Sequence, residues 1–167
     1  MVRVASIDDG IRISEIHIFA WRYAYHGFVE NKLLFNNYNV ITRLKSFEEH
    51  ISRGEEYYVY EEDGIVKGFM TIGSCRDEDK RDAFELWRIY IDPIFIGMGI
   101  GSQLITKFES LARERERTEL VVWVLKKNEL GINFYVKHGY SLEGKEQHLA
   151  NIDQTEIRYI KNIPQYQ

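Results

Sequence analysis

The chain has 167 residues, of which 44% are hydrophobic, and this is enough for one domain with its own core. The formal net charge is −4 and the basic residues are scattered, which argues against a nucleic-acid-binding surface. No apolar run approaches the roughly 20 residues that a membrane-spanning helix needs, and no leader-like segment opens the chain, so we expect a cytoplasmic protein without a membrane partner.

Cysteine and histidine usage bears on redox and metal chemistry. The single cysteine, Cys75, excludes an internal disulfide and a multi-cysteine metal site. It follows an apolar strand with no histidine near it in sequence, so we expect a structural role. The five histidines lack the spacing of metal ligands, and we therefore expect no metal.

The first half of the chain combines helical and strand patterns. We expect a strand over 2–6, a helix that Asp8 or Asp9 caps and that ends near Gly27, a loop or broken helix over 28–39, a helix over 40–53, and strands over 56–62 and 65–74. The last two strands are separated by Asp63-Gly64, which is a typical hairpin turn.

The second half predicts one parallel crossover followed by an antiparallel tail. We expect a strand over 83–91, a glycine turn leading into a helix, a strand over 120–125, a helix from Asn128 to Gly139, and strands over 140–147 and 154–162. A crossover of this kind is right-handed and has its ligand crevice at the carboxyl ends of the strands. The prediction is one α/β domain, residues 1–167, with a mixed, mostly antiparallel sheet, one parallel strand pair and flanking helices.

A glycine-spaced turn links the strand over 83–91 to its helix. Gly97, Gly99 and Gly101 remove Cβ atoms at alternate positions, so backbone amides can point one way at the start of a helix and bind an anion. The turn lacks the Gly-Lys-Ser/Thr ending of a nucleotide-binding P-loop, and Ser102 stands where a dinucleotide fingerprint needs a third glycine. By itself the turn fits a structural role as well as a phosphate site.

Two blocks resemble the GNAT superfamily of N-acetyltransferases, and the resemblance covers most of the chain. The segment 96–101, IGMGIG, is similar to the family's Gln/Arg-x-x-Gly-x-Gly/Ala pyrophosphate loop, although Ile96 lacks the polar side chain of the first position. The segment 128–140, NELGINFYVKHGY, is similar to Asn-x-x-Ala-x-x-Phe-Tyr-x-Lys-x-Gly-Phe. Residues 20–27 also resemble the first helix of many bacterial members. The resemblance implies a GNAT-like fold, acetyl-CoA as co-substrate and direct acetyl transfer to an amine.

The resemblance also implies a set of site residues. The residues expected to contact acetyl-CoA are Ile89, Tyr90 and Ile91 at the pantetheine arm, Gly97, Met98, Gly99, Ile100, Gly101 and Ser102 at the pyrophosphate, and Asn128 and Tyr135. Asn128 and Tyr135 are seven residues apart, which places both on one helical face. Asn128 fits a helix N-cap equally well, and Tyr135 fits a core aromatic. By resemblance, Tyr135 is the general acid that protonates the thiolate.

The general base and the acceptor are harder to derive. Glu85 is the best carboxylate candidate for the base, and it fits a solvated charge at a strand end equally well. Trp123 stands where the ribosomal-protein acetyltransferases carry a glutamate, which argues against that subgroup. The acceptor is an amine of a small molecule or a peptide. Five glutamates could favour a cationic amine or be solvated: Glu30, Glu48, Glu49, Glu55 and Glu56.

Three further hypotheses stay open. The loss of the polar residue at Ile96 permits a non-catalytic acyl-CoA-binding or sensing module. A nucleotide-binding regulatory domain would be protected against unfolding by ATP or NAD better than by CoA. An exposed terminal strand could pair with a second copy to form a homodimer.

Overall fold

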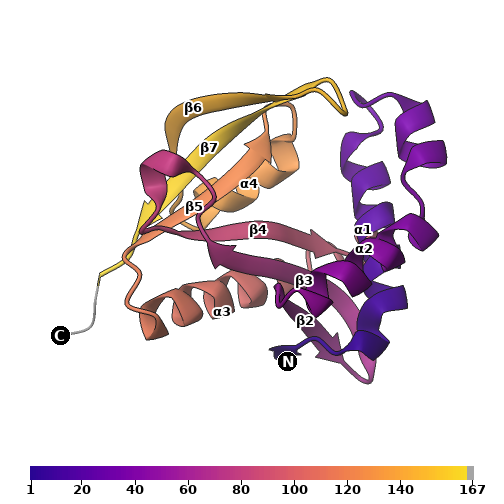
Figure 1. Ribbon diagram of the computed structural model, residues 1–167, viewed down its shortest axis with the longest axis horizontal. Helices are drawn as coiled ribbons and strands as arrows, with labels where there is room; N and C mark the ends of the chain where they lie inside the picture. The colour runs from indigo at the N-terminus through magenta and orange to yellow at the C-terminus, as the bar shows by residue number, and fades with distance from the viewer. Residues whose placement is uncertain (165–167) are drawn as a thin grey trace.

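Seven strands form one mixed sheet in the order β1-β2-β3-β4-β5-β7-β6 in the computed structural model, which describes residues 1–164 (Figure 1). The strands are β1 (Val2–Val4), β2 (Glu56–Glu62), β3 (Ile65–Ser74), β4 (Phe84–Ile91), β5 (Glu119–Leu125), β6 (Ser141–Leu149) and β7 (Gln154–Asn162). Only β4 and β5 pair in parallel; all other neighbours are antiparallel. The predicted mixed α/β fold is confirmed. Residues 165–167 lie outside the described part of the predicted 1–167 domain.

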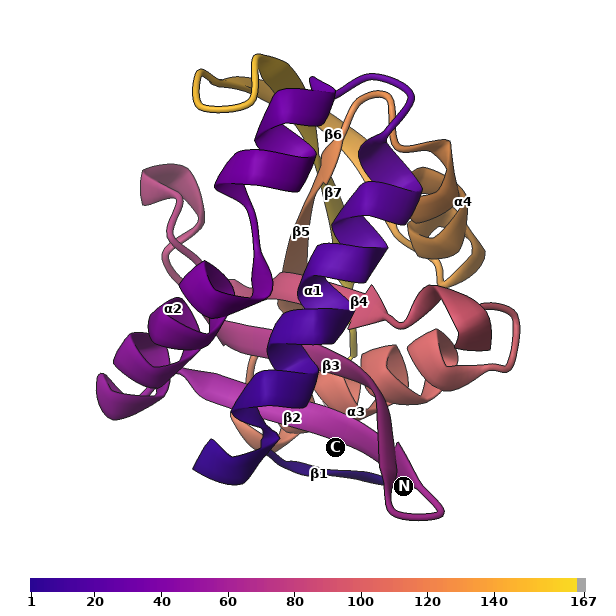
Figure 2. The same ribbon diagram turned by 90° about the vertical axis from the view of Figure 1, so that its right-hand side faces the viewer.

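Helices cover both faces of the sheet. They are α1 (Gly10–Tyr25), α2 (Val40–Ser52), α3 (Ile100–Glu114) and α4 (Glu129–Lys137). In Figure 2, α1 and α2 lie across the near face, and α3 lies behind the sheet. Side chains such as Ile16 and Phe47 fill the core under α1 and α2, whereas Leu104 and Phe108 fill the core under α3. The sheet therefore separates two hydrophobic cores, one under α1 and α2 and the other under α3.

One local prediction needs correction, because Asp9 does not cap α1 with its side chain. Its carboxylate accepts a hydrogen bond from the Ser6 amide at 2.7 Å and pairs with Arg3 at 2.8 Å. The last strand, β7, lies inside the sheet, where it pairs with β5 on one side and with β6 on the other. Among residues 1–164, the strands with an unpaired side are β1 and β6, and pairing between two copies through a sheet edge stays a prediction.

The segment between α1 and α2 is a broken helix, which is one of the two structures that the sequence predicted. It contains a π-helical turn, η2 (Leu33–Asn37). Its Tyr38 hydroxyl accepts a hydrogen bond from the Asn151 amide group at 3.1 Å, and Gln154 donates to the Phe28 carbonyl at 2.9 Å. The β6–β7 turn is therefore held against the α1–α2 connection, as Figure 1 shows at its upper right.

The two parallel strands, β4 and β5, separate toward their carboxyl ends, and we call the space between their unpaired ends the wedge. Pairing between β4 and β5 covers only Phe84–Leu86 opposite Leu120–Val122, although both strands continue further. On the other side of β4 the register shifts, because Arg88 pairs with Thr71 and Leu86 with Ile72, which leaves Trp87 as a bulge. The backbone of residues 87–91 therefore separates from β5. The carboxyl ends of the two strands form the walls of this wedge.

None of the helices in residues 1–164 combines the length and apolar character that crossing a membrane requires.

Candidate functional site

The glycine loop presents unpaired amides at the start of α3. Helix α3 begins at Ile100, and its first internal bond runs from the Gln103 amide to the Gly99 carbonyl at 3.2 Å. The first amides of a helix have no partner within it. Within residues 1–164, the amides of Gly97 and of residues 99–102 form no hydrogen bond. The loop therefore offers five donors and the positive end of the helix dipole to an anion.

Two residues of the loop differ from this pattern. The Met98 amide donates to the Phe95 carbonyl at 3.3 Å, and the Ile96 amide donates to the Pro93 carbonyl at 3.3 Å. The Met98 amide is therefore already used in a turn, and its side chain is 59% exposed. Of the predicted loop contacts, Met98 is the one whose backbone donor is occupied.

Glycine is needed in the loop for two different physical reasons. Gly97 and Gly99 have φ angles of 87° and 79°, in the left-handed region that side chains with a Cβ adopt at a cost. Gly101 has ordinary helical geometry, but a Cβ there would lie 2.9 Å from the Phe134 ring. Gly101 therefore lets α3 approach α4 closely.

A hydrogen-bond relay fixes Ser102 against α4. His138 Nδ1 lies 2.7 Å from the Phe134 carbonyl, which can only accept, so this nitrogen carries a proton. In the neutral ring Nε2 is then an acceptor, and the Ser102 hydroxyl donates to it at 3.0 Å. These hydrogen bonds use the Ser102 side chain, and the Ser102 backbone amide stays available at the loop.

On the α1 face of the wedge, Tyr90 is the centre of an aromatic cluster. Its hydroxyl accepts a hydrogen bond from Trp21 Nε1 at 2.8 Å, and the Tyr25 phenol interacts with it electrostatically. The His17 ring stacks on Tyr90 with centroids 4.6 Å apart. Burial raises the pKa of Tyr90 and that of Tyr25, so both phenols stay protonated. The Tyr90 hydroxyl accepts this one hydrogen bond and donates none within residues 1–164.

The predicted pantetheine residues therefore divide between the faces of the sheet. The side chains of Ile89 and Ile91 pack against the core beneath α3, whereas Tyr90 faces α1. The backbone of all three lies beyond the last β4–β5 pair, at the wedge.

Tyr135 of α4 approaches the wedge from the α3 face. Its side chain is 7% exposed, and burial, followed by the charge of Tyr90, raises its pKa above the ordinary value. Its hydroxyl forms no hydrogen bond within residues 1–164. A buried phenol without a partner is a proton donor that a ligand in the wedge can use.

Asn128 is the N-cap of α4, as one of its two readings predicted. Its side-chain oxygen accepts a hydrogen bond from the Gly131 amide at 3.1 Å. A Cβ at Gly131 would lie 2.6 Å from the Asn128 side-chain nitrogen, so the glycine leaves room for this cap. Nothing in the cap geometry prevents the amide group from also contacting a ligand.

Glu85 lies where β4 and β5 are still paired, not at the open wedge. Its side chain is 1% exposed, and its carboxylate accepts from the Arg76 amide at 2.9 Å and from Arg76 Nη2 at 2.6 Å. The solvated strand-end alternative is therefore wrong. These two charge-assisted hydrogen bonds hold the carboxylate in place beside Arg76.

Glu156, on β7, is a carboxylate at the open end of the wedge that sequence reasoning missed. It pairs with Leu125, the last residue of β5, and its charge acts on the Tyr25 phenol. Burial raises the pKa of Glu156, against the smaller lowering effects of a hydrogen bond from Gln147 and of Arg76. A carboxylate with a raised pKa is a stronger base. No local signal identifies Glu156, because it alternates with other polar residues along a strand.

Cys75 has the properties of a structural thiol. Its side chain is buried beside Ala83 and Val121, and burial raises its pKa to about 11. A thiol of this kind is protonated at neutral pH and is a poor nucleophile. Among residues 1–164, no three histidine, cysteine or acidic side chains come together as metal ligands do.

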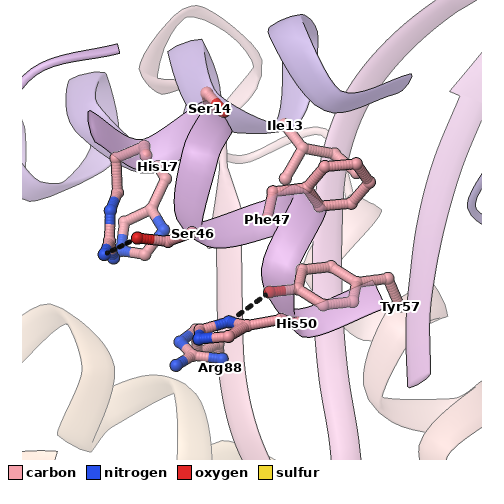
Figure 3. A pocket seen from close by; sticks show the side chains of 9 residues that line it. Ile13, Ser14, His17, Ser46, Phe47, His50, Tyr57 and Arg88 are labelled. Atoms are coloured by element: carbon pink, nitrogen blue, oxygen red, sulfur yellow. Dashed lines mark hydrogen bonds between the residues drawn. The ribbon is translucent and has the colours of Figure 1, made fainter. Parts of the chain in front are cut away.

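Two hollows lie on the α1–α2 side of the sheet. One is lined by Glu30 and Asp153 among others, measures about 450 Å³ and opens between the end of α1 and the β6–β7 turn. The other lies under α2, with an enclosed part of about 10 Å³, and is lined by Arg43 and Arg88 among others (Figure 3). Burial, followed by the charge of Arg88, lowers the pKa of Arg43.

The glutamates that were considered for a cationic acceptor do not form one cluster. Glu56 turns toward α3 and pairs with Arg115 at 2.6 Å, and Glu55 lies 3.6 Å from Arg88. Glu48 and Glu49 are exposed on α2. These four side chains therefore do not line one cleft, whereas Glu30 lines the hollow of about 450 Å³ together with Asp153.

The comparisons with known proteins all point to the same family. The sequence profile of the acetyltransferase (GNAT) family matches residues 15–140. An uncharacterized N-acetyltransferase of Methanocaldococcus jannaschii is 34% identical over 98 residues, which is 56% of this chain and 43% of that protein. The N-acetyltransferase YuaI of Bacillus subtilis is 28% identical over 127 residues, covering 76% of this chain and 72% of YuaI.

A solved structure shows the same fold. The crystal structure of the PaiA N-acetyltransferase of Thermoplasma acidophilum, in complex with coenzyme A, superimposes with a TM-score of 0.76. The superposition covers 98% of each chain at 20% sequence identity.

Proposed function

Because this chain belongs to the GNAT family of acetyltransferases, we propose that it transfers the acetyl group of acetyl-CoA directly to an amine. The observation that carries this proposal is the set of unpaired amides at Gly97 and residues 99–102, next to an open β4–β5 wedge. These amides would bind the diphosphate of acetyl-CoA. The separated backbone of residues 87–91 would pair with the pantetheine amides, as an added strand does. A neighbour of the same fold that was crystallised with coenzyme A supports this assignment.

Two side chains at the wedge supply the proton transfers. The amine nitrogen attacks the thioester carbonyl, the carbon–sulfur bond breaks, and the amine's proton must leave while the thiolate gains one. We assign proton donation to Tyr135, whose hydroxyl is without a partner in residues 1–164. We assign proton removal to Glu156, with Glu85 as the second candidate. Cys75 has no part in this direct transfer.

Release of free CoA thiol from acetyl-CoA across a panel of amines and peptides tests the proposed function. We expect thiol release that depends on an amine and yields an acetylated product of matching amount. If acetyl-CoA binds but no acceptor is acetylated, the non-catalytic sensing module is correct. If ATP or NAD raises the unfolding temperature more than CoA does, the nucleotide-binding alternative is correct.

The loop's role predicts the effect of Gly99→Ala. A Cβ at a φ of 79° costs about 1–2 kcal/mol, so the loop should relax and its amides should lose alignment. We expect CoA affinity, measured by calorimetry, to fall about tenfold, since 1.4 kcal/mol corresponds to a factor of ten. Gly54→Ala is the matched control, because Gly54 has a φ of 85° and open space around it at the end of α2. It should lose similar stability and keep its CoA affinity.

The sequence-based expectations of a cytoplasmic location and of pairing between two copies stay predictions. If two copies do pair through a sheet edge, β6 is the strand with an unpaired side at this end of the sheet.

A further inference from the structure

The hollow under α2 carries an unbalanced positive charge. Arg43, from α2, and Arg88, from β4, act on each other electrostatically, and each lowers the pKa of Tyr90. Glu55 lies 3.6 Å from Arg88, whereas Arg43 forms no ion pair within residues 1–164. Burial lowers the pKa values of His17 and His50, so both rings are neutral at pH 7. Two guanidinium groups therefore face one carboxylate.

The guanidinium groups also have spare donors. Each has five N–H donors, yet Arg43 donates only to Ser46 at 3.2 Å, and Arg88 only to Thr71 at 3.4 Å. Arg43 Nε is buried and has no hydrogen-bond partner. A buried donor without a partner is costly unless a ligand or water satisfies it. The hollow therefore offers an unsatisfied donor to an oxygen atom of a ligand or a water molecule.

The position of the hollow connects it to the wedge. Arg88 and Tyr90 are neighbouring side chains on one face of β4, about 7 Å apart along the strand. The Tyr90 hydroxyl lies within the electrostatic reach of both arginines. The hollow has an accessible volume of about 10 Å³, which is room for about one water molecule. One carboxylate oxygen would take the place of that water, with the rest of the acceptor outside the hollow.

We propose that Arg43 and Arg88 bind the carboxylate of the acceptor, so that the amine acetylated by this protein belongs to a small amino acid and not to a polyamine. This inference rests on the proposed function and specifies its acceptor. A carboxylate would balance the extra positive charge and accept the buried Arg43 Nε–H. With the carboxylate held at Arg88, the α-amine of the same molecule would lie toward Tyr90 and the wedge.

Matched acceptors test the proposal by binding alone. L-leucine, L-methionine and L-phenylalanine are each compared with their α-amide and their decarboxylated amine, and spermidine is added as a polyamine. Calorimetric titration into the CoA complex should show at least one amino acid binding 10- to 100-fold more tightly than its amide and its amine. The amide stands for a peptide N-terminus. Equal binding of the three forms, or tighter binding of spermidine, would overturn the proposal.

Variants of α2 identify the groups responsible. Arg43→Gln should remove the preference for the acid over the amide, and Arg43→Lys should restore part of it. Lys45→Gln makes the same charge change on an exposed position of α2 and should keep the preference. A preference that survives in Arg43→Gln, with unfolding temperature and CoA affinity unchanged, would contradict the assignment.

The same comparison separates this inference from the proposed function. Selective binding of an amino acid without thiol release would sustain the carboxylate site and refute acetyl transfer. Thiol release with amines that lack a carboxylate, at the same kcat/KM as with the amino acids, would sustain acetyl transfer and refute the carboxylate site.

Discussion

Tyr135→Phe should lower kcat for acetyl transfer by about 10²- to 10³-fold while the affinity for CoA stays unchanged. Removing a general acid typically costs a factor in this range. The substitution breaks no hydrogen bond within residues 1–164, because the Tyr135 hydroxyl forms none there. Its effect therefore reports on proton transfer to the leaving thiolate and not on folding. Initial rates of thiol release, together with calorimetric CoA binding, measure the two quantities.

The chain provides a matched control in Tyr140→Phe. Tyr140 is 2% exposed, its ring lies 5.7 Å from that of Tyr135, and its hydroxyl is buried without a partner. Its removal should leave kcat within about threefold and raise stability slightly, since an unsatisfied buried hydroxyl is unfavourable. Equal losses in both variants, or full activity of Tyr135→Phe, would contradict the role of Tyr135.

The pKa of Tyr135 gives this prediction a pH dependence. Burial, and then the charge of Tyr90, raises the pKa above its ordinary value of about 10. The phenol therefore stays protonated at every pH below that value. We expect no alkaline fall in kcat from this group below about pH 10.

Glu156→Gln should lower kcat/KM by about 10²- to 10³-fold at neutral pH, whereas Glu85→Gln should chiefly lower stability. Burial raises the pKa of Glu156, so its carboxylate accepts a proton more readily than an ordinary one does. The acid limb of the wild-type kcat/KM profile should lie above the ordinary glutamate value and disappear in Glu156→Gln. Initial rates from pH 4 to 9 measure it.

The substitutions Glu156→Gln and Glu85→Gln should change the free energy of unfolding in opposite directions. A folded-state pKa that is raised favours the protonated form, so the contribution of Glu156 is present at low pH and lost as pH rises through that pKa. At pH 7 Glu156→Gln should therefore raise the unfolding temperature slightly. Glu85→Gln weakens charge-assisted hydrogen bonds from Arg76, and a loss of about 1 kcal/mol would lower the temperature by about 2–4 °C. Loss of activity in Glu85→Gln alone would assign the base to Glu85.

The order and type of the main elements followed from sequence because local and global signals agree there. Asp63-Gly64 joins β2 and β3 as its hairpin pattern predicted, and Asn128 caps α4. The glycine loop precedes α3 with its amides available. This arrangement needs only the glycines and the start of a helix, and both can be recognised in the sequence. The placement of β7 between β5 and β6 was not predicted, since strand order depends on long-range pairing.

The sequence did not show that Arg43, Arg88 and Glu156 lie where we propose that the acceptor binds. Arg88 lies within β4, a strand whose other residues are mostly apolar, and this charge in a central strand was the available signal. Arg43 looks like any helix-surface residue, and Glu156 like any residue of an alternating strand. Their roles depend on how α2 and β7 pack against β4 and β5, and only the tertiary structure shows this.

We propose above all that the amides of residues 99–102 and the backbone of residues 87–91 hold acetyl-CoA for direct transfer. Amide hydrogen exchange with and without acetyl-CoA tests this most directly. Acetyl-CoA should slow exchange in both segments, and pantetheine, which lacks the diphosphate, should protect residues 87–91 only. Protection by acetyl-CoA that falls elsewhere and leaves both segments unchanged would contradict it.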